Sequence, residues 1–320
     1  MSRNRKNEVE SMAQYIMAEQ NLREIPVTDK IFGISKLAKD RISEIGKDKV
    51  VDATIGSLLE DDGRLAVFSS IVEVLRNLTP EEYADYAPIA GVPAYLDCVK
   101  KATFGDHVPA GYIEAVATPG GTGAIRNTIQ NYSKRGDVVL TSDWYWSPYK
   151  TISEEIERKL ETFELFNAEN QFNLPSFTAK VEELLTRQNG LVILFNAPAH
   201  NPTGYSPSHE EWDQILAFLK KAVQDSSKKI TFFLDSAYLE FCGDTEKFRT
   251  VFPKFSNLPE NLLVVVGFSM SKGYTLYGMR AGAMICITPN KAIAEEFKLV
   301  AAYSSRGTWS NSTRPAMMAL

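Results

Sequence analysis

The 320-residue chain is 44% hydrophobic and 23% charged, which is ordinary globular composition and argues against a disordered or fibrous protein. Its formal charge of -5 leaves no basic surplus for nucleic acid or an anionic membrane. No apolar run reaches the roughly 18 residues of a membrane span, and the first residues lack the apolar core of a signal peptide. Three widely spaced cysteines without a CxxC pair suit reduced thiols. We therefore expect a soluble, cytoplasmic protein.

The first third of the chain predicts an arm and several helices. Residues 1–26 are polar and helix-prone, and apolar residues from Ile34 to Ile45 follow at helical spacing. A second helical run covers residues 65–78. Pro and Gly then interrupt what would otherwise be one helix over residues 83–105.

From there, predicted strands and helices alternate. We expect strands at residues 112–119, 137–142, 162–167, 190–196, 229–235, 262–269 and 281–288. We expect helices at residues 121–136, 149–160, 206–224 and 290–305, and one around Leu184 and Leu185. Short apolar strands flanked by amphipathic helices predict an α/β fold with a mostly parallel sheet covered on both faces.

Polar residues follow five of these strands, in the stretches "TPGGTGA", "SDWYW", "NAPAHNPTGY", "DSAY" and "SMSK". Ligands of such sheets bind beyond the carboxyl ends of the strands, where the chain leaves for the helices. These five stretches are therefore the first candidates for a functional site.

The glycines of "TPGGTGA" let the backbone approach a ligand, and the helix that begins there offers unpaired amides to a phosphate. A dinucleotide fold is an alternative, because Gly121 and Gly123 match the start of GxGxxG and Asp143 ends the next strand. However, Arg126 stands where that motif has a small residue. A tight turn with no ligand is the third interpretation.

The stretches "DSAY" and "NAPAHNPTG" offer a carboxylate and amides. Asp235 closes an apolar strand, so its carboxylate is expected to need a cationic partner such as a protonated ring nitrogen, unless it is a helix N-cap. Asn201 could donate to a phenolic oxygen. His200 has no carboxylate at ligand spacing, so we interpret it as structural and expect no metal site.

Lys272 stands between two serines and a glycine, where an apolar run stops. A lysine with an ordinary pKa of about 10.4 is a poor nucleophile, but a partly dry one near another cation can lose its proton and form a Schiff base. Arg280 is eight positions further on, and Ser269 and Ser271 are small donors. A lysine for a carbonyl with Ser and Arg for a phosphate indicates a pyridoxal phosphate site. A solvated surface lysine is the alternative.

These ordered motifs, from "DKIFGISKLAKD" through "GTGA", "AHNPTG", "DSAY" and "SMSKGYTLYGMRAG" to "RGTWSN", resemble the class I pyridoxal-phosphate aminotransferases of fold type I, the aspartate aminotransferase-like group. The resemblance implies that Lys272 forms the Schiff base and acts as general acid and base. It implies that Asp235 holds the pyridine nitrogen protonated and that Tyr238 and Asn201 hydrogen-bond the ring oxygen. Trp144 would stack on the ring, with Trp146 as the alternative. The residues implied for the phosphate are Gly121, Thr122, Ser269, Ser271 and Arg280.

The resemblance also implies a homodimer with shared sites. Tyr86 would reach the neighbour's phosphate, and Arg306 would bind the distal carboxylate of a dicarboxylic substrate, because a guanidinium pairs bidentately with a carboxylate. A solvated arginine at a helix end is the alternative for Arg306. Gly56 resembles the backbone position that closes over the substrate. The implied domains are an arm at 1–26, the N-terminal part of a small domain at 27–64 and a large cofactor-binding domain at 65–320.

We expect transfer of an amino group from an amino acid, aspartate or glutamate, to a 2-oxo acid by a ping-pong route. An aromatic aminotransferase, a β-lyase acting on C–S bonds, a non-catalytic sensor and a nicotinamide dehydrogenase stay open as alternatives. Members of the resembled family continue past "NSTRPAMMAL" into a segment that completes the small domain and supplies the arginine for the substrate α-carboxylate. We therefore expect this sequence to be a fragment.

Overall fold

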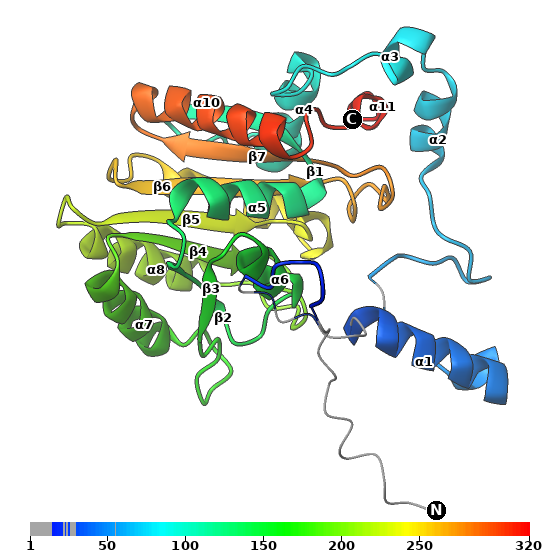
Figure 1. The fold of residues 1–320 in the computed structure, drawn as a ribbon, viewed down its shortest axis with the longest axis horizontal. Coiled ribbons are helices and arrows are strands. Elements are labelled where there is room, and N and C mark those ends of the chain that lie inside the picture. The colour runs from blue at the N-terminus through cyan, green and yellow to red at the C-terminus, as the bar shows by residue number, and fades with distance from the viewer. Residues whose placement is uncertain (1–14, 22, 24, 26–29, 55) are drawn as a thin grey trace, which may run out of the picture. The chain divides into compact units, whose positions relative to one another are not determined.

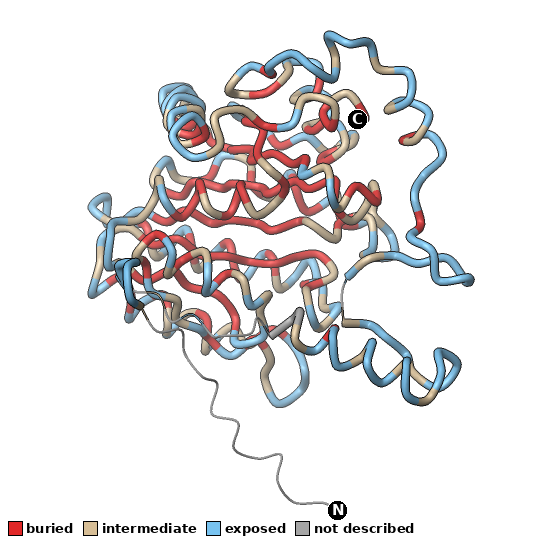
Figure 2. Tube along the Cα trace, turned by 45° about the vertical axis from the view of Figure 1, so that its right-hand side comes forward, coloured by how far each residue is buried: buried red, intermediate tan, exposed pale blue. Residues whose placement is uncertain are grey.

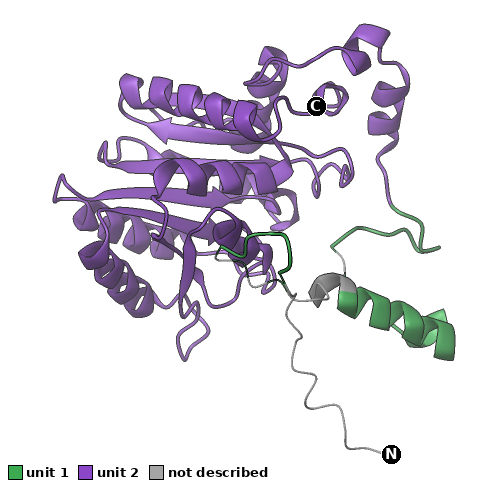
Figure 3. Cartoon of the chain, in the orientation of Figure 1, with its two compact units in different colours: residues 1–65 green, residues 66–320 purple. Residues whose placement is uncertain are grey.

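The computed structural model describes residues 15–21, 23, 25, 30–54 and 56–320, and the chain divides into two compact units, residues 1–65 and 66–320 (Figure 3). Most of the arm predicted over residues 1–26 lies outside the described residues. In the first unit, α1 (Lys30–Ile45) is the predicted helix, a 3-10 helix follows at Lys47–Lys49, and Leu59 forms an isolated bridge with Leu65.

The second unit contains the alternating strands and helices. Its strands are β1 (Tyr112–Pro119), β2 (Val138–Ser142), β3 (Lys159–Phe163), β4 (Gly190–Asn196), β5 (Lys229–Asp235), β6 (Leu262–Ser269) and β7 (Ala281–Thr288). Its helices are α2 (Ser69–Arg76), α3 (Pro80–Ala84), α4 (Pro93–Phe104), α5 (Gly120–Tyr132), α6 (Pro148–Glu155), α7 (Leu174–Arg187), α8 (His209–Ala222), α9 (Thr245–Arg249), α10 (Lys291–Thr308) and α11 (Arg314–Met317). Short 3-10 helices lie at Leu239–Phe241 and Phe252–Phe255.

In the described residues the strands form one seven-stranded sheet in the order β1-β7-β6-β5-β4-β2-β3 (Figure 1). β7 is antiparallel to both of its neighbours, and the other neighbouring pairs are parallel. The predicted α/β class with a mostly parallel sheet is therefore confirmed. The carboxyl ends of β1, β6, β5, β4 and β2 consequently meet at one edge, where the amino end of β7 also lies.

Helices cover both faces of the sheet, and the core lies in two layers. On one face, α5 packs on β4, which contributes Val192 and Leu194, α10 packs on β1 and β7, and α6 packs on β3. On the other face, α7 packs on β4, which contributes Leu191 and Ile193, α4 packs on β1 and β7, and α8 contributes to the same core. Side chains of successive strand residues point to opposite faces, so a strand covered on both sides must be apolar throughout. Figure 2 shows the resulting concentration of buried residues along the strands.

Most predicted strands coincide with the observed ones, but the third does not. The strand predicted at 162–167 is observed at Lys159–Phe163, where its five residues pair in parallel with β2. Residues 164–167 instead enter a turn in which Phe166 bridges to Phe172. The helix predicted over 149–160 ends at Glu155, and Glu157 shortly after it has a positive φ of 61°. None of the described helices combines the length and apolarity needed to cross a membrane.

Candidate active site

The reversal between β6 and β7 brings three distant segments to one place. Pro119 at the end of β1 pairs with Ala281, and Ser269 at the end of β6 pairs with Gly282. Arg280 immediately precedes β7, so the antiparallel direction of this strand places Arg280 beside the ends of both neighbours. The first turn of α5, the residues around Ser269 and Arg280 therefore share one edge of the sheet.

Arg280 packs directly on the start of α5. Gly120 has a φ of +67°, and a Cβ built on it would meet Arg280 Nη2 at 2.8 Å. Arg280 Nη1 donates to Ser271 Oγ at 3.1 Å and to the carbonyl of Tyr277 at 2.9 Å. A side chain at position 120 would fill the space that the guanidinium occupies. The glycine is thus required for the close approach of the arginine.

The surroundings of Arg280 suit a phosphate. Ser269 and Ser271 are buried, and Ser269 Oγ accepts from the backbone amide of Ser271 at 3.2 Å. Gly121 faces Ser269, with 3.6 Å from a Cβ built on the glycine to the serine Cβ. The residue before α5, Pro119, makes no side-chain cap, so the first amides of the helix have no capping side chain. Hydroxyls, a guanidinium and helix amides are the groups with which proteins bind anions.

Asp235 is buried at the end of β5. Its Oδ2 accepts from the hydroxyl of Tyr149 at 2.5 Å, and its Oδ1 accepts from the amide of Ala237 at 3.2 Å. Burial raises the pKa of this carboxyl, and the two hydrogen bonds oppose that rise. Among the described residues no basic side chain pairs with Asp235. A buried carboxylate with neutral donors alone can accept a further, cationic donor such as a ring N–H.

Hydrogen bonds of Asn196 and His200 hold the "NAPAHNPTG" loop in place. Asn196 donates through Nδ2 to the carbonyl of Asp235 at 2.9 Å and accepts through Oδ1 from the amide of Asn201 at 2.5 Å. The ring of His200 lies between Thr203 Oγ1 at 2.9 Å and Ser142 Oγ at 3.3 Å. Burial lowers the pKa of His200, which keeps the imidazole neutral. The loop therefore holds Asn201 beside the end of β5.

Lys272 is half-buried in the turn between β6 and β7. Burial lowers the pKa of its ammonium below the ordinary 10.5, and the nearby charge of Arg280 lowers the pKa further. Its Nζ lies 5.5 Å from the ring centroid of Tyr238 and 5.3 Å from that of Tyr277. The lysine is thus partly desolvated beside another cation, as a nucleophilic amine requires. Tyr277 was missed in the sequence, although it belongs to the same "SMSKGYTLYG" stretch.

The two tryptophans of "SDWYW" differ in their surroundings. Trp144 is 55% exposed, whereas Trp146 is partly buried and packs edge-on against Tyr149, with 5.8 Å between ring centroids. Asp143, the acidic residue of the dinucleotide alternative, accepts through Oδ1 from the amides of Trp144 and Leu165. Its carboxylate therefore holds a turn together.

The remaining predicted residues lie elsewhere. Gly56 belongs to the first unit, shortly before the Leu59–Leu65 bridge. Tyr86 is 83% exposed, and Arg306 near the end of α10 is exposed and donates to Ser310 Oγ at 2.6 Å. Within the described residues there is no His, Cys, Asp and Glu cluster suited to a metal ion.

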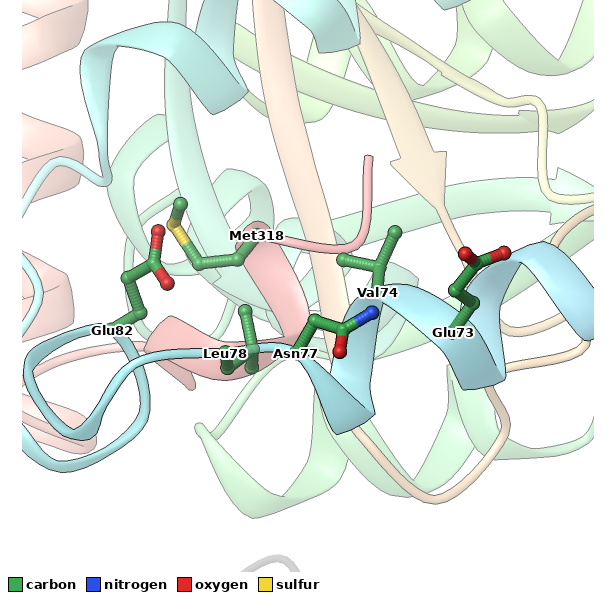
Figure 4. A pocket seen from close by; sticks show the side chains of 6 residues that line it. All are labelled: Glu73, Val74, Asn77, Leu78, Glu82 and Met318. Carbon is green, nitrogen blue, oxygen red and sulfur yellow. The ribbon is translucent and has the colours of Figure 1, made fainter.

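A separate cavity of about 350 Å³ lies where α2 and the segment between α2 and α3 approach α11 (Figure 4). It contains none of the predicted site residues and is lined by Glu73, Val74, Asn77, Leu78, Glu82 and Met318. Glu82 also completes the capping box of α3 by accepting from the amide of Thr79.

One sheet edge therefore carries groups whose chemistry suits a phosphate (Arg280 and the serines), a cationic ring nitrogen (Asp235) and a carbonyl (Lys272). These residues fit pyridoxal phosphate. Residues 48–320 match the family model of class I and II aminotransferases, and the chain belongs to this family. The predicted family is confirmed, and the dinucleotide alternative is set aside.

Several known proteins are similar to this chain. Mitochondrial aspartate aminotransferase of Arabidopsis thaliana is 27% identical over 78% of the chain and 57% of its own length, and aspartate aminotransferase of Salmonella typhi is 29% identical over 80% and 62%. The chain thus spans about three-fifths of these relatives. An aromatic-amino-acid aminotransferase of Pseudomonas aeruginosa is 29% identical over 63% of the chain and 48% of its own length.

Among solved structures, an aminotransferase from Anaerococcus prevotii is 42% identical, with a TM-score of 0.92 over 95% of this chain and 74% of that one. An aromatic-amino-acid aminotransferase from Burkholderia pseudomallei, covalently bound to pyridoxal phosphate, shares the fold with a TM-score of 0.76 at 23% identity over 95% and 74% of the two chains.

Proposed function

We propose that the chain acts as a pyridoxal-phosphate-dependent aminotransferase. It would move an amino group between an amino acid and a 2-oxo acid, with aspartate or glutamate as donor, in a ping-pong reaction. The observation that carries the proposal is the meeting of Lys272, Asp235 and Arg280 at one sheet edge in a chain of this family. When bound, pyridoxal phosphate supplies an electron-withdrawing ring that stabilises negative charge at the substrate α-carbon.

Five residues would bind the phosphate. Arg280 supplies the charge, Ser269 and Ser271 supply hydroxyls, and Gly121 and Thr122 supply amides at the start of α5. The hydrogen bond from Arg280 to Ser271 and the close approach of Arg280 to α5 support this assignment.

The remaining site residues would act on the ring and the substrate. Asp235 would keep the ring nitrogen protonated, and Asn201 and Tyr238 would donate to the ring oxygen. Lys272 would hold the aldehyde carbon and, once displaced by the substrate amine, move the proton at the substrate α-carbon. Its lowered pKa supports this role, because a general base must be deprotonated near the operating pH.

For the residue that packs on the ring face, the geometry favours Trp146 over Trp144. Trp146 contacts Tyr149, whose hydroxyl is bonded to Asp235, whereas Trp144 is largely exposed. Trp146 therefore packs against the tyrosine that hydrogen-bonds to Asp235, the residue assigned to the ring nitrogen.

We further propose a homodimer with shared sites, in which Tyr86 reaches the partner's phosphate and Arg306 binds the distal carboxylate of its substrate. The exposure of both side chains supports this assignment. Gly56 would close over the substrate through its backbone. Residues 65–320 would form the large domain, 27–64 the N-terminal part of the small domain and 1–26 an arm. The three cysteines, all within the described residues, form no disulfide, which supports a cytoplasmic location.

Exchange of Lys272 for Ala tests the proposal. The variant should lose all transamination, while Lys221→Ala, at an exposed lysine of α8, should keep it. Borohydride reduction of the loaded wild-type protein followed by digestion should find the cofactor adduct on the Lys272 peptide. Full activity of Lys272→Ala, or an adduct on another peptide, would show that the assignment is wrong.

An aromatic aminotransferase is the second candidate, and the similarity to the Pseudomonas aeruginosa protein supports it. Steady-state rates with aspartate, phenylalanine and a cystathionine-like thioether separate the candidates and the β-lyase alternative. If Arg306 binds a distal carboxylate, Arg306→Leu should reduce kcat/KM for aspartate and leave that for phenylalanine nearly unchanged.

A further inference from the structure

The hydrogen-bonding partner of Asp235 is a phenol from another part of the fold. Tyr149 lies in the first turn of α6, is fully buried and donates to Asp235 Oδ2 at 2.5 Å. Because the other oxygen, Oδ1, accepts from Ala237, each carboxylate oxygen has one protein donor. Each oxygen has two lone pairs, so the carboxylate keeps accepting capacity for a ligand.

We propose that Tyr149 is a positioning residue that orients the Asp235 carboxylate, in its ionised form, toward the ring nitrogen of the cofactor. This inference rests on the proposed function. The phenol acts through Asp235 and takes no part in proton transfer at the substrate.

The hydroxyl of Tyr149 suits this task because it can only be a neutral donor here. Burial and the neighbouring Asp235 raise the pKa of Tyr149 well above its usual range, so the phenol keeps its proton. A hydrogen bond donated to a carboxylate favours the ionised form. Tyr149 thereby counters the effect of burial on Asp235, which alone favours the neutral acid. An ionised partner is the form that keeps a ring nitrogen protonated.

The ring of Tyr149 is itself held on two sides. Tyr145 is stacked parallel to it at 6.5 Å between centroids, and Trp146 meets it edge-on at 5.8 Å. Aromatic packing of this kind fixes the ring plane, and with it the direction of the hydroxyl. The same side chain therefore links Asp235 to Trp146, the residue assigned to the ring face.

Tyr149→Phe tests the inference, because it removes the hydroxyl and keeps the packing. The readout is the Kd for pyridoxal phosphate, measured by absorbance and tryptophan fluorescence without substrate. We expect about a tenfold weaker Kd, since hydrogen bonds to charged groups are among the stronger ones. Tyr205→Phe is the matched control: the Tyr205 hydroxyl donates to Glu211 at 2.6 Å, the same chemistry elsewhere in the fold. Its Kd should stay within about twofold of wild type.

A cofactor analogue with carbon in place of the ring nitrogen separates positioning from general packing. With this 1-deaza analogue, Tyr149→Phe should change the Kd by less than about twofold, because the ring has no N–H that could donate a hydrogen bond to Asp235. In an Asp235→Asn background, Tyr149→Phe should likewise change the Kd for pyridoxal phosphate by less than about twofold.

If Tyr149→Phe lost the same affinity for pyridoxal phosphate and for the deaza analogue, the inference would be overturned, since Tyr149 would then have a purely structural role. Unchanged affinity in Tyr149→Phe, with normal binding by wild type, would also overturn it and would leave the proposed function intact. Failure of the wild-type chain to bind pyridoxal phosphate through Lys272 would overturn the proposed function, and this inference with it.

Discussion

The guanidinium of Arg280 lies so close to the Cα of Gly120 that a methyl group on the glycine would approach Nη2 to 2.8 Å. Gly120→Ala should therefore do two things. It should cost about 1 kcal/mol of folding free energy, because φ is +67° there, and it should displace Arg280 and weaken binding of pyridoxal phosphate at least about tenfold.

Gly136→Ala separates these two effects. Gly136 has a φ of +85°, and nothing lies within 4 Å of a Cβ built on it. This variant should lose similar stability in chemical denaturation and bind the cofactor normally. Normal cofactor affinity in Gly120→Ala would contradict the assignment of Arg280 to the phosphate.

Asp235→Asn should change stability and cofactor affinity in opposite directions. Burial raises the pKa of Asp235, so above that pKa the ionised carboxylate costs folding free energy in the cofactor-free protein. The Asp235→Asn substitution should therefore raise the unfolding free energy of the cofactor-free chain by about 1 kcal/mol at neutral pH. This difference from wild type should shrink at lower pH, where the wild-type carboxyl becomes protonated. Denaturation curves with and without pyridoxal phosphate measure both effects. Asp106→Asn, at an exposed site, should change neither, and a destabilised Asp235→Asn protein would contradict this account.

Arg280→Gln should raise the pH at which Lys272 becomes reactive. Two causes depress the pKa of Lys272, burial first and Arg280 second, so removal of the arginine restores only part of the shift. The rate of imine formation with pyridoxal, which has no phosphate to bind, should have a midpoint below 10.5 in wild type. In the variant, the midpoint should move upward and stay below 10.5. An unmoved midpoint would mean that the two cations do not interact.

Removal of His200 should make the protein less sensitive to acid. Burial lowers the pKa of His200 below the ordinary 6.5, so the unfolded chain binds more protons between the two values. Stability is therefore fully present above pH 6.5 and falls as the pH drops through this window. Unfolding free energies of His200→Gln should vary less with pH between about 5 and 7 than those of wild type.

The sequence was sufficient for most of the sheet because its strands are short apolar runs that stop at polar residues. β4, β5, β6 and β7 have the predicted ends, Asn196, Asp235, Ser269 and Thr288. β3 was misplaced because, in the sheet of the described residues, it is an edge strand paired only with β2 and partly exposed, so its apolar pattern is weak. The apolar residues that followed it were mistaken for the strand.

Tyr149 was missed because its role depends on a contact between residues 86 positions apart. Local sequence shows only a tyrosine after a proline at the start of a helix. The close approach of Arg280 to Gly120 is equally non-local. It follows from the antiparallel direction of β7, which an apolar stretch of eight residues does not reveal.

The position of β7 also bears on the order in which the chain assembles. In the described sheet, β1 is an outer strand whose only neighbour is β7, although residues 120–280 are translated between the two. A nascent chain on the ribosome therefore cannot seat β1 in the sheet until residues 281–288 have emerged. The edge that gathers Gly120, Ser269 and Arg280 is completed only after β7 has been translated, so we expect cofactor capture to follow translation of this region.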